Sequence, residues 1–293
     1  LGDYIISKLK LDAPPPDLSQ WREMVKQMRA ADDALHIGIV GKYVELHDAY
    51  MSVKEAVYHA ASALGKTLHI HWIHSGELEK GKGFKELEAM QGIIVPGGFG
   101  YRGVEGKILA ARFARENNVP YLGLCLGMQV MSIEFARNVL GLEDANSSEF
   151  EPSSSEHSII DLMHDQRGIT DLGGTMRLGH YACHLRDQSI AAAAYGNVDV
   201  VQERHRHRFE FNNAYRDEFE ANGAVFSGLS PDGRLVEIIE LRDHPFMVGS
   251  QFHPEFQSRP NAPHPLFKAF VQGVMQTASS NTTNSNEQLI TQE

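Results

Sequence analysis

Cysteine and positive charge are both scarce in this sequence. Only two cysteines occur among the 293 residues, Cys125 and Cys183, and two are too few for a disulfide framework or a cysteine-rich zinc site. The 27 Lys and Arg residues are outnumbered by 38 Asp and Glu residues, which gives a formal net charge of −11. This balance argues against nucleic acid as a partner, because phosphate binding depends on clustered Lys and Arg.

Long apolar runs are also missing. No uninterrupted apolar stretch approaches the ~20 residues that a membrane span requires, and the first residues lack the basic-then-apolar pattern of a signal peptide. We therefore predict a cytoplasmic protein with no membrane partner. The chain starts at Leu1 without a Met, which suggests a fragment of a longer protein.

Alternating strand and helix patterns indicate an α/β fold. The expected domain spans residues 35–276 and has a mostly parallel central sheet flanked by helices, a flavodoxin-like three-layer arrangement, with a small strand-rich later part. Residues 1–34 are interpreted as an interdomain linker with a short helix, because three successive prolines at 14–16 enforce extended backbone. Residues 277–293 are mostly Ser, Thr, Asn and Gln, so we predict a disordered polar tail.

Apolar periodicity places the individual elements. The predicted strands cover residues 36–40, 68–73, 92–95, 119–124, 223–226, 235–241 and 246–252. The predicted helices cover residues 51–64, 103–117, 126–140 and 265–275.

Cys125 lies where an apolar strand meets a helix, between Gly123 and Gly127. A small residue two positions before and after a nucleophile is typical of a nucleophile elbow, here with Cys in place of Ser. The glycines leave room for a tight turn, and the free N–H groups of the helix N-terminus favour a thiolate. A buried structural cysteine would show the same local pattern, so this turn alone leaves both interpretations open.

A candidate base and a candidate oxyanion hole follow strands elsewhere in the chain. His253 comes at the end of a predicted strand, and Glu255 is close enough to orient its imidazole, so Cys, His and a carboxylate are all present. Gly98 follows the strand at 92–95, and consecutive glycines let backbone N–H groups turn toward an anion. We assign the oxyanion hole to the N–H groups of Gly98 and Leu126.

These segments together resemble the class I, triad-type, glutamine amidotransferases, and further strings resemble the glutaminase part of the CTP synthase family. Those strings span residues 41–43, 98–103, 141–150, 173–179 and 203–210, and the resemblance covers nearly all of the chain from Leu1 to Gly273. It implies that the substrate is L-glutamine, which Cys125 attacks and which leaves as glutamate and ammonia.

The resemblance also implies which residues bind glutamine and which cover the site. The implied glutamine-binding residues are Gly98, Leu126, Gly127, Met128, Gln129, Glu149 and Arg208. The chemistry of these residues suits glutamine. Gln129 is one helical turn beyond Cys125 and so lies on the same helix face, the Glu149 carboxylate can pair with the substrate ammonium, and the Arg208 guanidinium can pair with the substrate carboxylate. The implied mobile lid is Gly174, Thr175, Met176, Arg177, Leu178 and Gly179.

The family's partners and cofactors act largely outside this chain. The resemblance implies an N-terminal synthetase domain that uses ATP and Mg²⁺ to aminate UTP, GTP as an allosteric activator, and a homotetramer or filament of the full-length enzyme. We expect no cofactor in this chain, because the glycines of residues 38–42 stand too close together for a phosphate-binding loop.

Other interpretations remain at this stage. The His and Arg run at 203–208 could ligate a metal or form a solvated charged surface, but its arginines repel a cation, so we predict no metal site. The chain could be a catalytically silent regulatory module, or it could belong to another class I amidotransferase, such as one serving GMP or anthranilate synthesis.

Overall fold

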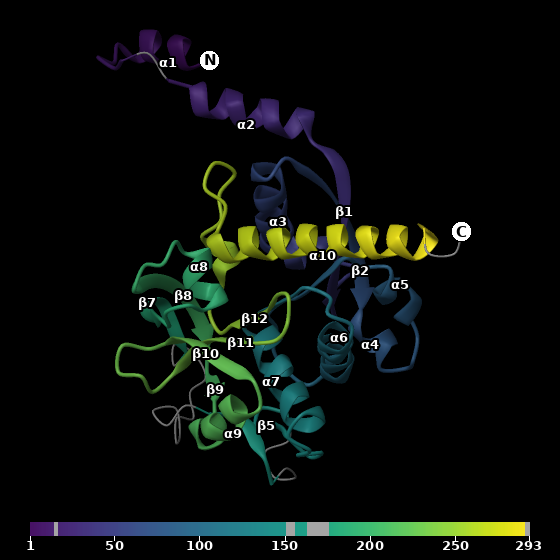
Figure 1. The fold of residues 1–293 in the computed structure, drawn as a ribbon. Coiled ribbons are helices and arrows are strands. Elements are labelled where there is room, and N and C mark those ends of the chain that lie inside the picture. The colour runs from purple at the N-terminus through teal and green to yellow at the C-terminus, as the bar shows by residue number, and fades with distance from the viewer. Residues whose placement is uncertain (15–16, 151–155, 163–175, 291–293) are drawn as a thin grey trace.

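A central β-sheet organises the chain in the computed structural model, which describes residues 1–14, 17–150, 156–162 and 176–290 (Figure 1). Within these residues the main sheet has nine strands in the order β2-β1-β3-β4-β12-β11-β10-β7-β8. Their bounds are β1 (Asp32–Gly41), β2 (Lys66–His74), β3 (Gly92–Val95), β4 (Tyr121–Leu124), β7 (Arg177–Leu185), β8 (Val200–His207), β10 (Ala224–Leu229), β11 (Val236–Leu241) and β12 (Met247–Ser250). The first five strands in this order are parallel and the remaining neighbours are antiparallel.

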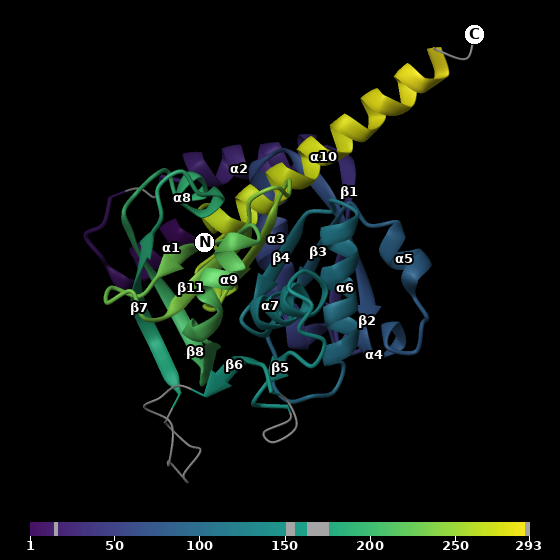
Figure 2. The ribbon, with the colours of Figure 1, turned by 60° about the horizontal axis from the view of Figure 1, so that its bottom comes forward.

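Helices cover both faces of this sheet, as Figures 1 and 2 show from two directions. One face carries α3 (Met51–Ala63), α8 (Ile190–Ala194) and α10 (Pro265–Ile290), and the other carries α4 (Ser75–Leu78), α5 (Phe84–Glu88), α6 (Val104–Glu116), α7 (Leu126–Asn138) and α9 (Arg216–Ala221). Side chains alternate along β3, so Ile93 and Val95 pack in one core while Ile94 packs in the other. The predicted three-layer α/β fold with a strand-rich later part is therefore confirmed.

A second, smaller sheet lies beside the end of α7. It consists of β5 (Asn146–Ser147), β6 (Ser158–Leu162) and β9 (Phe209–Phe211), in that order. The main-sheet strand β8 ends at His207, two residues before β9 begins, so the two sheets are joined through Arg208.

The N-terminal segment forms two helices, α1 (Gly2–Leu9) and α2 (Ser19–Ala30), which Figure 1 shows beyond α3 and α10. No residue of either helix is buried. Strand β1 begins at Asp32, slightly before the predicted domain start at residue 35. None of the helices described here is long and apolar enough to cross a membrane.

The structure differs from the predicted tail at the C-terminus. Helix α10 continues to Ile290, whereas the sequence predicted disorder from residue 277. The hydroxyl groups of Thr277, Ser279 and Ser280 each donate to the carbonyl four residues earlier, which satisfies these polar side chains within the helix. No glycine or proline interrupts the segment after Gly273.

Candidate active site

Cys125 occupies a strained turn between β4 and α7. Its φ of 50° and ψ of −102° lie outside the regions that residues other than glycine favour, and the residue is the N-cap of α7. Its amide donates to the Ser250 carbonyl at 2.7 Å, which fixes the turn against β12. This is the conformation of a nucleophile elbow, as the sequence predicted.

The two glycines around Cys125 are required by close backbone packing. A Cβ on Gly127 would lie 2.0 Å from the Val95 carbonyl oxygen, and one on Gly123 would lie 2.6 Å from the Gly127 backbone. The start of α7 therefore rests directly on the end of β3. This contact places Cys125 beside the glycine loop that follows β3.

His253 and Glu255 form the predicted pair behind the cysteine. Nδ1 of His253 lies 2.7 Å from Oε1 of Glu255, and both side chains are largely buried. Burial alone lowers the pKa of His253, but attraction to Cys125 and the interaction with Glu255 outweigh it and raise the pKa above its ordinary value. The remaining nitrogen, Nε2, interacts with Cys125 but makes no hydrogen bond of ordinary geometry within the described residues. It is therefore free to exchange a proton at the reaction centre.

The Gly97–Gly98 backbone lies between His253 and Cys125 on one side and the side chains of Lys42 and Lys107 on the other. A Cβ on Gly97 would be 2.9 Å from Cε1 of His253 and 3.5 Å from Cβ of Cys125. On the Gly98 side, the nearest side chain is that of Leu126, 3.4 Å from a Cβ built there. Leu126 is the first residue of α7, so its N–H has no intrahelical acceptor. The amides assigned to the oxyanion hole thus belong to adjacent segments beside Cys125.

A cavity of about 360 Å³ opens on Cys125. It joins residues from β4–α7, the glycine loop, the small sheet and the start of β7. Its lining residues are Gly98, Phe99, Cys125, Gln129, Glu149, Met176, His207, Arg208 and Phe209. Six of these were predicted site residues: Gly98, Cys125, Gln129, Glu149, Met176 and Arg208.

Opposite charges line this cavity. Oε1 of Glu149 accepts a hydrogen bond from the Gly100 amide at 2.8 Å. Burial raises the pKa of Glu149, while the Gly100 hydrogen bond and the charges of Lys42 and Arg208 act in the opposite sense. Nε of Arg208 is buried without a hydrogen-bond partner in the described part of the chain. A ligand with both an ammonium and a carboxylate would satisfy the two groups at once.

Two glutamine side chains, Gln129 and Gln251, connect the cavity to Cys125, and only Gln129 was predicted from the sequence. Nε2 of Gln129 donates to the Phe209 carbonyl at 3.1 Å and to Oε1 of Gln251 at 3.2 Å. Nε2 of Gln251 in turn lies 3.6 Å from Sγ of Cys125. Gln251 was missed in the sequence, although its position two residues before His253 on the same strand end was a usable signal.

Three predicted glutamine-binding residues do not line the cavity: Leu126, Gly127 and Met128. Gly127 packs against Val95, and its carbonyl accepts a hydrogen bond from the Tyr121 hydroxyl at 2.8 Å. Met128 is fully buried, and a Cβ on Gly249 would lie 2.8 Å from its side chain. Gly127 and Met128 support the elbow from the core side. In the first turn of α7 some residues face the cavity and others face the core, and these two face the core.

The predicted lid divides into three parts. Gly174 and Thr175 lie outside the described residues, and Met176 lines the cavity. The range Arg177–Gly179 begins β7 and pairs with His207, Arg206 and His205 of β8. These three residues belong to the main sheet, where ladder hydrogen bonds and the buried ion pair of Arg177 hold them, and their role as a lid stays a prediction.

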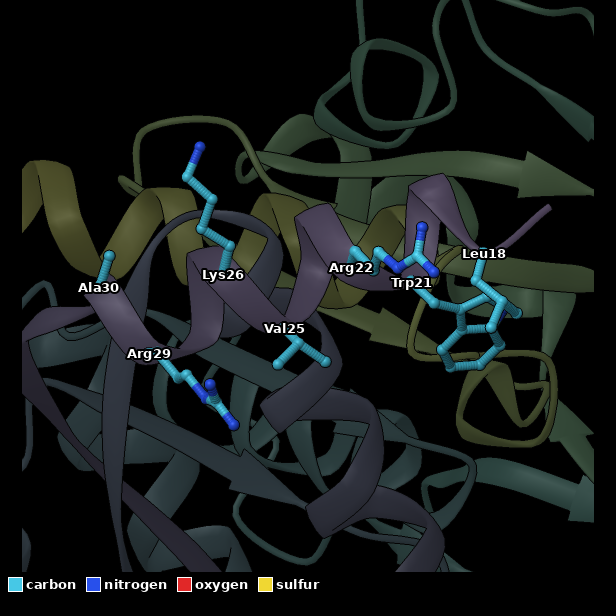
Figure 3. A pocket seen from close by; sticks show the side chains of 7 residues that line it. All are labelled: Leu18, Trp21, Arg22, Val25, Lys26, Arg29 and Ala30. Atoms are coloured by element: carbon cyan, nitrogen blue, oxygen red, sulfur yellow. The ribbon is translucent and has the colours of Figure 1, made fainter. Parts of the chain in front are cut away.

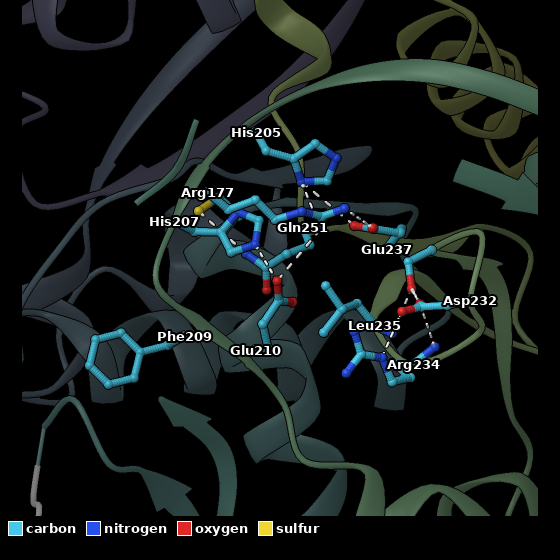
Figure 4. A network of polar contacts seen from close by, with 12 residues as sticks. Arg177, His205, His207, Phe209, Glu210, Asp232, Arg234, Leu235, Glu237 and Gln251 are labelled. Atoms are coloured by element: carbon cyan, nitrogen blue, oxygen red, sulfur yellow. Dashed lines mark hydrogen bonds and ion pairs between the residues drawn. The ribbon is translucent and has the colours of Figure 1, made fainter. Parts of the chain in front are cut away.

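A buried polar network fills the space behind the cavity (Figure 4). Arg177 pairs with Glu237 at 2.7 Å and approaches Glu210 at 3.6 Å, and Nε2 of His207 lies 2.6 Å from the same Glu210 oxygen. Burial raises the pKa of Glu237 to about 7, although the hydrogen bond from Arg177 lowers it. Burial and the nearby His207 and Arg177 hold the pKa of His205 far below its ordinary value.

The structure divides the His and Arg run between the core and the surface. Strand β8 alternates, so Glu203, His205 and His207 are buried while Arg204 and Arg206 are exposed. Only half of the run is a solvated charged surface. No group of three His, Cys, Asp or Glu side chains suited to a metal ion is found in the described residues.

A larger hollow, of about 570 Å³, lies along α2 (Figure 3). In that view Trp21, Val25 and Arg29 point to the same side of the helix, and Lys26 points away from them. The described lining residues are all from residues 18–30 and include no nucleophile and no carboxylate. We therefore place the active site at the cavity on Cys125 and not here.

Comparison with known proteins identifies the family of this chain. Residues 45–273 match the family described as glutamine amidotransferase class-I. The chain therefore belongs to the class-I glutamine amidotransferase family. Within that family its similarity is to CTP synthases. The chain is 56% identical to the CTP synthase of Dehalococcoides mccartyi over 271 residues and 58% identical to that of Chloroflexus aurantiacus over 277 residues.

These relatives are longer than the chain. The matches cover 92% and 94% of this chain but only 49% and 50% of the relatives, so the chain spans about half their length. A solved structure of the glutaminase domain of Trypanosoma brucei CTPS, with bound acivicin, is also similar. It has a TM-score of 0.77 and 39% identity, and the match covers 83% of this chain and 94% of that domain.

Proposed function

We propose that this chain hydrolyses L-glutamine to glutamate and ammonia with Cys125 as nucleophile, His253 as acid and base, and Glu255 as its orienting carboxylate. One observation carries the proposal: a single cavity joins Cys125 to Glu149 and Arg208, the charges that complement the two ends of an amino acid. The buried His253–Glu255 pair beside the cysteine supports the same chemistry.

The reaction follows from these positions. The thiolate of Cys125 attacks the side-chain amide carbon of glutamine, and the N–H groups of Gly98 and Leu126 receive the developing oxyanion. Protonated His253 donates its Nε2 proton to the amide nitrogen, so that ammonia leaves and a glutamyl thioester remains. His253 then takes a proton from water, which attacks the thioester and releases glutamate with the Cys125 thiolate restored.

The wider role is also a proposal. Because the curated relatives are CTP synthases about twice as long, we propose that a preceding synthetase domain uses the ammonia for the ATP-dependent amination of UTP to CTP. ATP and Mg²⁺ would act in that domain, and no step in this chain passes through them. GTP activation and a homotetramer or filament are expected of the full-length protein on the same ground.

Two cysteine variants test the glutaminase activity. Cys125→Ala removes the nucleophile and should abolish ammonia release from glutamine. Cys183→Ala is the matched control, because this other cysteine is buried in β7 and burial raises its pKa far above the ordinary thiol value. It should retain the activity of the unmodified chain.

An electrophilic glutamine analogue separates the remaining alternatives. Covalent labelling of Cys125, located by peptide mass spectrometry, supports an active glutaminase. Ammonia release that survives in Cys125→Ala would sink the proposal. A folded chain that neither labels nor releases ammonia, even when joined to its synthetase domain, would identify a silent regulatory module.

A further inference from the structure

Lys107 is a fully buried lysine that the proposed reaction does not use. It lies on α6 with no exposed surface, and its Nζ donates a long hydrogen bond of 3.4 Å to the Pro96 carbonyl. A Cβ built on Gly98 would lie 3.5 Å from the same Nζ. The ammonium group therefore sits directly behind the glycine loop assigned to the oxyanion hole.

This position is costly for a cation. Lysine is almost never fully buried unless it is paired, and no carboxylate of the described residues lies within ion-pair distance of Lys107. Burial lowers the pKa of Lys107 to about 7, the charge of Lys42 acts in the same direction, and Cys125 opposes both. The one group that favours the charged form of Lys107 is thus the nucleophile.

Two lysines, Lys107 and Lys42, bind backbone carbonyls on either side of the Gly97–Gly98 loop. Gly97 and Gly98 have no side chains that could fix their peptide planes. Lys107 binds the Pro96 carbonyl before them, and Nζ of Lys42 donates to the Phe99 carbonyl after them. A trans peptide directs its C=O and N–H to opposite sides, so the bond to the Pro96 carbonyl turns the Gly97 N–H away from Lys107, and the two lysines together restrain both ends of the Gly97–Gly98 segment.

We propose that Lys107 is a positioning residue of the glutaminase site, which restrains the loop that carries Gly98 through its bond to the Pro96 carbonyl and stabilises the thiolate of Cys125 by its charge. This inference rests on the proposed function, since it assigns Gly98 to the oxyanion hole. Lys107 does not line the cavity, so it would act on the reaction through the loop and through Cys125. A lysine kept only for stability is the competing explanation.

Two variants separate charge from hydrogen bonding. Lys107→Met keeps the approximate volume but removes the charge and the donor, while Lys107→Gln removes the charge and keeps an N–H for Pro96. Arg112→Met is the matched control, because it removes one positive charge from the exposed side of the same helix. All three are compared with the unmodified chain for folding by circular dichroism.

The first readout is the pH dependence of alkylation of Cys125 by iodoacetamide, measured on its tryptic peptide. Both Lys107 variants should shift the half-alkylation pH upward by roughly half a unit to one unit, as expected for loss of a nearby unit charge. Arg112→Met should leave it unchanged. A structural role for Lys107 would not move this pH.

The second readout is glutamine hydrolysis. Lys107→Met should lower kcat by roughly 10- to 100-fold, as for partial loss of an oxyanion donor, with KM changed by less than about threefold because Lys107 does not touch the substrate cavity. Lys107→Gln should recover part of kcat. Should Lys107→Met fail to fold, the alkylation profile of Lys107→Gln decides the question.

The outcomes distinguish this inference from the proposed function. Folded Lys107 variants with the alkylation profile and kcat of the unmodified chain would overturn the role of Lys107 and leave the glutaminase proposal intact. An unmodified chain that releases no ammonia, together with a shifted profile in the variants, would overturn the glutaminase proposal and support the effect of Lys107 on Cys125.

Discussion

Gly127→Ala should separate the geometry of the active site from the stability of the fold. A Cβ at this position would lie 2.0 Å from the Val95 carbonyl oxygen and 3.0 Å from the Val95 carbonyl carbon. Both atoms are backbone, so no side chain can rotate away. Either the start of α7 or the end of β3 has to move by roughly 1 Å to restore an ordinary contact.

The clash should lower activity, because α7 and β3 each lead into one part of the proposed reaction centre. Helix α7 begins next to Cys125, and β3 leads into Gly98, so any relief of the clash separates the nucleophile from its oxyanion donor. A misplacement of about 1 Å can cost about 100-fold in rate. Overpacking of this kind costs about 1–3 kcal/mol of unfolding free energy, which still leaves the chain folded at 25 °C.

The measurement compares kcat per folded molecule with urea unfolding. Gly228→Ala is the control, because its Cβ would lie 2.7 Å from the Ile238 side chain and 2.8 Å from Sγ of Cys183, three strands away from β4. It should lose comparable stability and keep its kcat. If Gly127→Ala keeps the kcat of the unmodified chain, the proposed contact between elbow and loop does not set the catalytic geometry.

Two further predictions concern charge. Glu149→Gln keeps the acceptor for the Gly100 amide but removes the charge opposite the substrate ammonium, so KM for glutamine should rise by roughly 10- to 100-fold with little change in kcat; an unchanged KM would contradict the assignment. The pKa of Lys107 is lowered from 10.5 to about 7 in the folded chain, so the folded state binds fewer protons and wild-type stability falls as pH drops from about 10.5 to about 7. Lys107→Met should therefore be more stable by about 2–4 kcal/mol at pH 7, and urea unfolding should show this gap shrinking toward pH 10; a gap independent of pH would refute it.

Local patterns were sufficient for the elements that build the elbow. Strand β3 has its predicted bounds, and α3 and α7 begin at the predicted residues, Met51 and Leu126, because apolar periodicity and glycine turns mark them in the sequence. Cys125 stands directly after β4, and His253 and Glu255 follow the end of β12 at Ser250, so the strand patterns placed all three near one edge of the sheet; their catalytic roles stay predictions.

Residues whose role depends on packing between distant elements were missed. Gln251 reaches Cys125 only because β12 lies beside β4, and Lys107 reaches the Pro96 carbonyl only because α6 packs on the sheet. Lys107 did leave a signal: it occupies the buried stripe formed with Val104, Ile108 and Ala111, at the i, i+3, i+4 and i+7 spacing of a helix face. A lysine in an otherwise apolar helix face conflicts with the hydrophobic pattern around it, and such conflicts are expected at functional positions.

Strands β7 and β8 were missed because nearly every side chain along β8 is polar. The alternation of Arg and His at residues 204–207 has the period of a strand, but the hydrophobic contrast that usually reveals it is absent. The buried His205 and His207 lie 3.6 Å from Glu237 of β11 and 2.6 Å from Glu210, which follows three residues after His207.

The backbone strain at Cys125 has an evolutionary consequence. A non-glycine residue held at φ 50° costs on the order of 1–3 kcal/mol, and glycine there would relieve most of that cost. A copy of this fold released from catalysis would therefore gain stability by replacing the cysteine with glycine. In any descendant of this sequence, the residue at position 125 therefore indicates whether the thiol is still under selection. Cysteine lowers the stability of the fold at this position, so it is retained only while the thiol is needed.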